Sequence, residues 1–455
     1  MLEAVLSRVR PSPLERDRLK SVARKIVSRI EELADARGVE GEPMLVGSAA
    51  RGTWLSGDHD LDIFIGVSEG SNLSSALEIA RRVAPNFEER YAEHAYVHAI
   101  FEGFEVDLVP CYLVEDGSKI LSAVDRTPFH SRYVSARIRG REDEALLLKQ
   151  FMKGTGVYGS ELKVGGFSGY LAELLVIRRG SFISVLEEAA HWRPGEVIDL
   201  EDHSSREHED PLVVVDPVDP GRNVAAALTL DRMFTFVAAS RLFLEEPKLD
   251  FFFPAPVSPL SDDELRDQIA KRKSTLILLE FEAPDQVEDV IFPQLRKAEQ
   301  SIRALLDRNG FSVMRSDVDW HRNLPLGGGE RGGSEWRGLL RIFLELSVAS
   351  LPRVERRIGP PVWEAEHSKK FAASHPYPLS GPYVEDGRLV VETTRKFVDA
   401  PELLRSQVAN LSVGRHLGPQ LRRGYKIYVG QEILEVEDLE FRAFLARYFS
   451  AREWV

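Results

Sequence analysis

Two aspartates, Asp60 and Asp62, stand two residues apart at the start of an apolar run that continues to Val67. Side chains at positions i and i+2 of a β-strand point to the same face, so a strand here would bring both carboxylates to one spot. Two ionised carboxylates this close repel each other unless a cation lies between them, and an all-oxygen site suits Mg²⁺. The doublet therefore predicts a strand with a metal site at its beginning.

A glycine-serine turn precedes this doublet. The short apolar run Met44–Val46 leads into Gly47 and Ser48, and Arg51 follows about one helical turn later. A helix that begins at this turn would present free backbone N–H groups to an anion, with the arginine beside them. The segment therefore predicts a phosphate-binding turn next to the two carboxylates.

A third carboxylate, Asp107, stands inside the apolar run Phe104–Val109. The run Tyr96–Phe101 precedes it across Glu102 and Gly103, which is the spacing of a tight β-hairpin. Burying an unpaired charge is costly, so Asp107 needs a metal, a basic partner or solvent. A surface position is the usual reason for one aspartate in a strand. The turn, the doublet and the third strand in this order favour a two-metal site instead.

Local patterns divide the 455 residues into three parts. A capping box at Ser12–Glu15 predicts a long helix that ends near Gly38, within a first part that forms a small sheet flanked by helices. From Glu142 the pattern is mostly helical. Prolines at 254, 256 and 259 mark a linker, and the strands and helices expected beyond it suggest an open-faced α/β layer. The glycine-rich segment 327–333 predicts a loop.

Charge and cysteine content narrow the class of protein. The formal net charge of −13 argues against a protein that coats nucleic acid non-specifically. Residues 1–255 hold 30 Lys and Arg against 42 Asp and Glu, whereas 256–455 hold 29 against 30, so a local basic surface is compatible with the second part. A solvated surface explains the same charges. One cysteine, the lack of a membrane-length apolar run and the lack of a signal peptide predict a cytoplasmic protein without a membrane partner.

The order of Gly-Ser, Asp-x-Asp and a later lone Asp resembles that of the polymerase β-type nucleotidyltransferase superfamily. Further runs look like those of archaeal-type, class I CCA-adding enzymes, in the same order and at similar separations. They are RYAEHAYVH (90–98), VDLVPCY (106–112), SAVDRTPFH (122–130), GFSGYL (166–171) and VDPVDPGRNVAA (215–226). The similarity extends over about the first 250 residues and continues more loosely through PQLRKAEQ (293–300).

This resemblance implies an α+β enzyme with three domains. They are a polymerase β-like nucleotidyltransferase domain (1–140), a helical central domain (141–257) and a C-terminal α/β region that binds RNA (258–455). The implied activity is stepwise addition of CMP, CMP and AMP from CTP and ATP to the 3′ end of tRNA, without a template, with two Mg²⁺ ions and release of pyrophosphate. The partner would be tRNA, held through its 3′ end and its acceptor and T-stem region, and a homodimer is compatible with the resemblance.

The resemblance also implies roles for particular residues. Asp60, Asp62 and Asp107 match the catalytic metal ligands. Arg222 matches an arginine that reads the incoming base. The nucleotide-binding positions are matched by Gly47, Ser48, Arg51, His130, Lys149 and Tyr158. Without the resemblance, Lys149 and Tyr158 are a helix-surface lysine and a partly buried aromatic, and Arg222 is a helix-start arginine paired with Asp216 or Asp219.

Three other motifs have simpler explanations. His94 and His98 are spaced like zinc ligands, but their segment is predicted to run from a loop into a strand. Ser168, in GFSGY, lacks the final glycine of a nucleophile elbow and fits a helix cap. Cys111 follows a strand without an evident base and fits a packed thiol.

Two other functions remain open from the sequence. The first is an adenylyltransferase that acts on another RNA or on a small molecule, and use of CTP on tRNA that lacks its CCA end separates it from a CCA-adding enzyme. The second is an inactive RNA-binding relative. Retention of all three aspartates, Ser48 and Arg51 argues against it.

Overall fold

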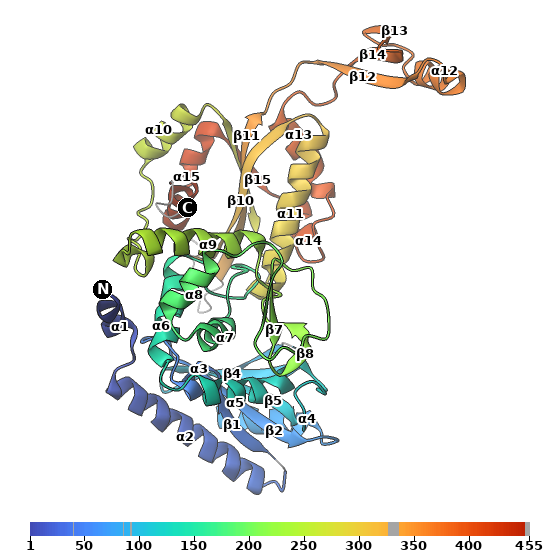
Figure 1. Ribbon diagram of the computed structural model, residues 1–455. Coiled ribbons are helices and arrows are strands. Elements are labelled where there is room, and N and C mark those ends of the chain that lie inside the picture. Colours follow the sequence, from blue (N-terminus) through green and yellow to red (C-terminus); the bar gives the residue numbers. More distant parts are fainter. Residues whose placement is uncertain (40, 85, 92, 326–335, 451–455) are drawn as a thin grey trace. The chain divides into compact units, whose positions relative to one another are not determined.

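The computed structural model describes residues 1–39, 41–84, 86–91, 93–325 and 336–450 (Figure 1). The described chain mixes helices and strands, as predicted for an α+β protein. It divides into two compact units between Ala255 and Pro256, within the proline-rich segment that the sequence marks as a linker. Each unit has hydrophobic clusters of its own. The glycine-rich segment 327–333 lies outside the described residues.

Five strands form the first sheet, in the order β1-β2-β5-β4-β3. Their bounds are β1 Glu42–Val46, β2 Asp60–Ser68, β3 Phe87–Tyr91, β4 Ala95–Phe101 and β5 Phe104–Leu113. β2 and β5 run parallel, while the other neighbours are antiparallel. The predicted hairpin of β4 and β5 is confirmed, and it turns at Glu102 and Gly103. Both residues have positive φ, as a type I′ turn requires.

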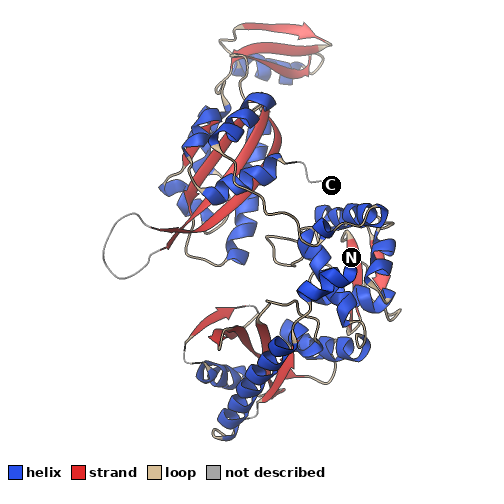
Figure 2. Cartoon of the chain, turned by 90° about the vertical axis from the view of Figure 1, so that its left-hand side faces the viewer, coloured by secondary structure: helices blue, strands red, loops and turns tan. Residues whose placement is uncertain are grey.

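Two helices, α2 (Pro13–Asp35) and α4 (Leu73–Val83), cover one face of this sheet (Figure 2). α2 begins with the predicted capping box: the Ser12 side chain accepts the Glu15 N–H at 3.2 Å, and the Glu15 carboxylate accepts the Ser12 N–H at 2.7 Å. Leu61 and Ile63 of β2 are buried against these helices. Because side chains alternate along a strand, Asp60 and Asp62 lie on the opposite face of the sheet.

Two short helices of the same unit, α3 (Gly47–Arg51) and η1 (Ala123–Arg126), contact the first sheet. The unit also has a helical layer, whose helices are α1 Leu2–Val9, α5 Thr127–Arg137, α6 Glu142–Gly154, α7 Gly169–Arg179, α8 Phe182–Ala189, α9 Leu230–Glu245 and η2 Leu249–Phe251. Phenylalanines fill its core: the Phe151 ring lies 5.4 to 6.0 Å from those of Phe182, Phe236 and Phe243.

The helical layer also contains a small sheet that was not predicted from the sequence. β6 (Glu196–Asp199), β7 (Leu212–Asp216) and β8 (Asp219–Asn223) pair in that order. The five residues of β7 are all buried. A continuous apolar run of this length has no alternation, so its periodicity does not distinguish a strand from a helix.

The second unit contains a sheet in the order β10-β11-β9-β15. The strands are β9 Thr275–Glu282, β10 Ser312–Pro325, β11 Trp336–Val348 and β15 Lys426–Val429. Helices α11 (Glu288–Arg308), α13 (Ala400–Gln407), η3 (Val408–Asn410) and α14 (Leu417–Arg423) pack on one face, and α10 (Asp262–Arg272), η4 (Gly430–Glu435) and α15 (Leu439–Phe449) pack on the other. The predicted open-faced layer is therefore wrong: Ile277 and Leu279 face one helical layer, and Leu276 and Leu278 face the other.

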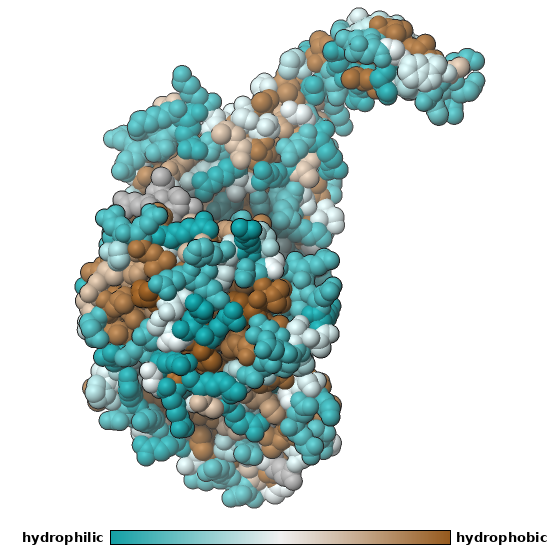
Figure 3. Space-filling view, viewed as in Figure 1, coloured by the Kyte–Doolittle hydropathy of each residue, from teal (hydrophilic) through white to brown (hydrophobic). Residues whose placement is uncertain are grey.

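A three-stranded sheet with one helix completes the described chain. It pairs β12 (Val354–Pro361), β14 (Arg388–Thr394) and β13 (Ser380–Glu385), and α12 (Ala365–Ser374) packs on β12. Apolar side chains gather at its surface (Figure 3), including Ile358 and Val384, whose exposed fractions are 66% and 60%. In the described ranges, no helix is long and apolar enough to cross a membrane.

Candidate active site

The three predicted carboxylates lie on the face of the first sheet that is opposite α2 and α4. The parallel register of β2 and β5 places Asp62 opposite Asp107 and Asp60 opposite Glu105. On the adjacent strand, His98 lies opposite Asp107 in the antiparallel register, and its Nδ1 is 2.6 Å from an Asp107 carboxylate oxygen. Asp107 therefore has a basic partner as well as two acidic neighbours. This agrees with the expectation that Asp107 needs a basic partner, a metal or solvent.

Burial and crowding of negative charge change the acidity of the doublet. Burial, together with the nearby Asp107 and Asp60 carboxylates, raises the pKa of Asp62 to about 6. Burial also raises the pKa of Asp60, with added repulsion from Glu105 and Asp58. A cation placed among these carboxylates would relieve the repulsion and return them to the ionised form.

The glycine-serine turn forms next to this cluster. Gly47 starts the single-turn helix α3 with a φ of 71°, and a Cβ atom at this position would collide with the Asp62 carboxylate. Both facts require glycine. The turn thereby brings the α3 backbone against the doublet and places Arg51 at the end of α3.

A buried carboxylate, Glu173 of α7, holds Arg51 in place. An Arg51 guanidinium nitrogen lies 2.8 Å from Glu173, and the Lys149 ammonium donates to Glu173 and to the Thr53 carbonyl, both at 2.9 Å. The Thr53 hydroxyl also donates to Glu173. Burial lowers the pKa of Lys149, and Glu173 opposes that shift. Burial would raise the pKa of Glu173, but Lys149 and Arg51 outweigh it and lower that pKa. The cluster thus places two basic side chains around one buried carboxylate.

A cavity of about 800 Å³ opens beside these groups. Of the predicted nucleotide-binding residues, Gly47, Arg51, His130 and Arg222 line it. Ser48, Lys149 and Tyr158 are not among its lining residues. Lys149 is not the surface lysine that the sequence alone suggested, because it is buried within the Glu173 cluster. The roles of all seven residues toward a nucleotide stay predictions.

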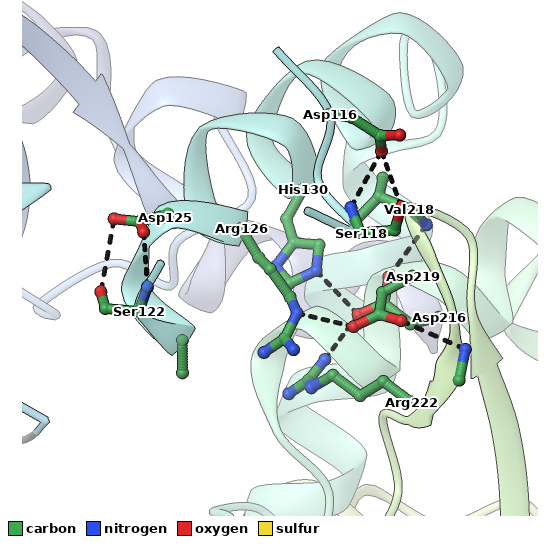
Figure 4. Close-up of polar contacts among 12 residues, drawn as sticks. Asp116, Ser118, Ser122, Asp125, Arg126, His130, Asp216, Val218, Asp219 and Arg222 are labelled. Atoms are coloured by element: carbon green, nitrogen blue, oxygen red, sulfur yellow. Dashed lines mark hydrogen bonds and ion pairs between the residues drawn. The ribbon is translucent and has the colours of Figure 1, made fainter. Parts of the chain in front are cut away.

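The far wall of the cavity is built around Asp216, the last residue of β7 (Figure 4). Arg222 of β8 pairs with Asp216 at 2.6 Å, and His130 of α5 bonds to the same oxygen at 2.8 Å. The predicted alternative for Arg222 is therefore half correct: it pairs with Asp216, but it lies on a strand and not at a helix start. In the same view, Arg126 pairs with Asp219 at 2.8 Å.

Three further residues, Glu173, Arg126 and Tyr170, lie at this site, although their roles were not predicted from the sequence. A signal for Glu173 was present, since it is an acidic residue inside the apolar run Leu171–Ile177, the same anomaly that identified Asp107. Arg126 and Tyr170 are ordinary residues in their segments. Only the folded arrangement places them on the cavity wall.

The three simpler explanations agree with the structure. His98 lies on β4 and binds Asp107. The Ser168 side chain caps α7 by accepting the Leu171 N–H at 3.1 Å. Cys111 is the packed thiol that was predicted, although it lies within β5 and not after the strand: it is fully buried, and burial raises the pKa of its thiol to about 12.

Three protein-family models match the chain: a nucleotidyltransferase domain over 24–130, the second domain of tRNA nucleotidyltransferase over 143–253, and the C-terminal domain of CCA-adding enzymes over 272–325 and 336–430. The CCA-adding enzyme of Methanosarcina barkeri is 44% identical, covering 98% of this chain and 97% of that protein. The chain belongs to the CCA-adding enzymes.

Two further CCA-adding enzymes support the assignment. The protein from Methanothermobacter thermautotrophicus is 41% identical over 98% of this chain and 97% of its own length. The protein from Haloarcula marismortui is 40% identical over 99% of both chains. As a CCA-adding enzyme, the protein builds the CCA end of tRNA stepwise from CTP and ATP and uses a divalent metal ion. This identity excludes the inactive relative and the adenylyltransferase with another acceptor.

The carboxylates fit a divalent ion whose coordination the substrate completes. In the part of the chain that the structure describes, no three His, Cys, Asp or Glu side chains form a preformed metal cluster. Mg²⁺ in nucleotide sites is bound by one or two carboxylates, with waters and substrate phosphates as the other ligands. Asp60 and Asp62 supply such carboxylates on one face, and burial together with repulsion from neighbouring carboxylates raises both of their pKa values in the absence of a cation.

Asp62→Asn should stabilise the metal-free protein at neutral pH. Because the folded-state pKa of Asp62 is about 6 and its unfolded value is about 4, ionised Asp62 disfavours the folded state above pH 6. We expect the variant to be more stable than the wild type by about 1 to 3 kcal/mol at pH 7.5 in EDTA, after allowance for partial exposure, and equally stable at pH 3.5.

Calorimetric unfolding at both pH values measures this difference. Glu88→Gln, on the edge strand β3, is the control and should show little pH-dependent change, because its side chain is exposed. An Asp62→Asn protein no more stable than the wild type at pH 7.5 would contradict the crowding of charge at the doublet.

Proposed function

We propose that the first unit joins CMP and AMP to the tRNA 3′ end by two-metal-ion nucleotidyl transfer at Asp60, Asp62 and Asp107. The observation that carries the proposal is the parallel register of β2 and β5, which sets Asp62 opposite Asp107 beside the Gly47 turn. Asp60 and Asp62 would hold both Mg²⁺ ions, and Asp107 would complete the site on the side of the attacking hydroxyl. Mg²⁺ held there would supply the charge that lowers the pKa of the 3′-hydroxyl and neutralises the triphosphate and the departing pyrophosphate.

The chain's own residues would orient the nucleotide. Arg51 is a cavity-lining cation whose position is fixed by Glu173, so it is preorganised to meet the triphosphate. Ser48, Lys149 and Tyr158 would act from the same side, Lys149 through the buried cluster that it shares with Arg51. At the opposite wall, His130 and Arg222 would contact the nucleotide, with Arg222 reading the base.

One chemical site serves both nucleotides in this proposal. Asp60→Ala, Asp62→Ala and Asp107→Ala should therefore each reduce CMP and AMP addition together, by at least about a hundredfold, because each removes a group that stabilises charge in the transition state. Extension of tRNA that lacks CCA, with labelled CTP or ATP and Mg²⁺, measures both activities.

Glu88→Ala is the matched control, since it removes an exposed carboxylate of the same sheet and should keep both activities. A folded aspartate variant that kept either CMP or AMP addition at the wild-type rate would overturn the single-site proposal.

We further propose that residues 258–455 hold the acceptor and T-stem region of tRNA through backbone phosphates, recognising shape more than sequence. A cavity of about 600 Å³ in the second unit supports this, because four cations and two phenylalanines line it. They are Arg308, Arg357, Arg395, Lys396, Phe371 and Phe397. Glu355 is the single carboxylate on its wall.

Removing one of these basic side chains should lower the affinity for tRNAs of different sequence by similar factors. Arg357→Ala and Lys396→Ala should each lower affinity and reduce the slope of log affinity against log salt by about one, as expected for a lost phosphate contact. Lys271→Ala is the control, because Lys271 is paired with Asp267 on α10 and is not part of this cavity wall. Filter binding across a salt series measures both the affinity and this slope. Unchanged slopes would contradict phosphate contact at this cavity.

Three finer points rest on the sequence and the resemblance. They are the domain limits at 140 and 257, the cytoplasmic location and the homodimer. Sedimentation of the full chain against its monomer mass of 51.2 kDa tests the last of these.

A further inference from the structure

Asp216 is a buried carboxylate to which four donors converge. Its Oδ2 atom takes the Arg222 guanidinium at 2.6 Å and the His130 Nε2 atom at 2.8 Å. Its Oδ1 atom accepts the Val218 N–H at 3.1 Å and the Tyr170 hydroxyl at 3.3 Å. The side chain of Asp216 has no exposed surface, whereas 38% of the Arg222 side chain is exposed. The carboxylate therefore stands behind the cavity wall, and its partners form the wall.

Three separate elements supply these partners. His130 comes from α5, Tyr170 from α7 and Arg222 from β8, and all three line the cavity of about 800 Å³. The His130 and Tyr170 rings also stack, with centroids 4.3 Å apart. Figure 4 shows His130 and Arg222 pointing toward Asp216 from two sides. One carboxylate thus fixes side chains that no single helix or strand could align.

We propose that Asp216 is a positioning residue for nucleotide selection, because it fixes Arg222 and His130 as one unit that faces the nucleotide. The proposal rests on the proposed function, in which Arg222 reads the base. It adds that selectivity depends on a carboxylate that does not itself line the cavity.

The bonding pattern determines which donors remain for the nucleotide. Burial alone would raise the pKa of Asp216, but its bonds to His130 and the charge of Arg222 outweigh burial and lower that pKa. An ionised carboxylate can only accept, so the Nε2 atom of His130 carries a proton. Arg222 donates Nη1 to Asp216, which leaves its Nε and Nη2 donors for the cavity.

Arg222 donors that are held in one orientation can discriminate between the bases. Cytosine and adenine offer a ring-nitrogen acceptor beside an exocyclic amino group on the Watson–Crick edge. Uracil and guanine carry a ring N–H at that place, so donor would face donor. A guanidinium held by an ion pair cannot rotate away from that conflict, whereas an unheld one can. Loss of the anchor should therefore favour the wrong nucleotides relative to the correct ones.

The test measures single-turnover addition of CTP and UTP to tRNA that lacks CCA, and of ATP and GTP to tRNA that ends in CC. We expect Asp216→Asn to lower kcat/KM for CTP and ATP by about tenfold or more and to change kcat/KM for UTP and GTP much less. The ratio of kcat/KM for the correct nucleotide to that for the incorrect one should therefore fall by about tenfold. Asparagine keeps the size of the side chain but has an NH2 group in place of one carboxylate oxygen, so one pair of donors loses its acceptor.

A double-mutant cycle separates positioning from support of the fold. If Asp216 acts through Arg222, then Asp216→Asn in an Arg222→Ala background should narrow selectivity no further. Asp125→Asn is the matched control. Asp125 is also fully buried and accepts the N–H groups of Tyr112, Leu121 and Ser122, but none of these three residues lines the cavity, unlike the side-chain partners of Asp216. This variant should lower thermal stability and leave the ratio of CTP to UTP addition unchanged.

Several results would overturn the proposal. An equal loss for all four nucleotides, or additive effects in the cycle, would make Asp216 a support of the fold. Asp216→Ser, whose smaller side chain leaves room for a water molecule, is the second variant. Failure of both variants to fold would also assign the carboxylate to the fold alone. A wild-type protein that adds no CMP would overturn the proposed function together with this inference, whereas an active wild type with unchanged selectivity in Asp216→Asn would overturn the inference alone.

Discussion

The parallel pairing of β2 with β5 is the constraint on which the catalytic face depends. Leu61 and Ile63 alternate with the aspartates of β2, and Val106 and Leu108 flank Asp107 on β5. These four apolar side chains are buried in the core that α2 and α4 share with the sheet. A slip of one residue would move an aspartate into that core and an apolar side chain out of it. Hydrophobic burial on one face therefore sets the distance between carboxylates on the other.

Glu173 is a second constraint, and it connects the catalytic sheet with the helical layer. It belongs to α7, while its partners Arg51 and Thr53 follow β1 and Lys149 belongs to α6. Removing one member of a buried ion pair typically costs about 3 to 5 kcal/mol, because the remaining charge is left unpaired. The side chains that attach the layers to each other are thus the same ones that, in the proposed function, would meet the triphosphate.

The features predicted correctly from the sequence are those that short segments encode. The capping box of α2, the hairpin at Glu102 and Gly103, and the same-face placement of Asp60 and Asp62 each follow from neighbouring residues. Order and spacing of such segments also identified the family.

The features that the sequence did not reveal depend on contacts between distant segments. Burial of Lys149 requires Glu173 and Thr53, which lie 24 and 96 residues away. The small sheet of β6, β7 and β8 forms between runs that carry no alternating pattern. One face of the sheet in the second unit is covered in part by α15, which comes from the C-terminal end of that unit. None of these three features follows from one short segment of the sequence.

The central claim is that three carboxylates on neighbouring strands hold the metal ions of nucleotidyl transfer. A crystal structure of the full chain with Mn²⁺ and a non-hydrolysable CTP analogue tests it most directly, because anomalous scattering locates each ion. The account predicts two ions that share Asp60 and Asp62, one of them also bound by Asp107, with the triphosphate directed toward Arg51. Ions bound away from these three carboxylates, or an Asp107 that remains paired with His98 and binds no ion, would contradict it.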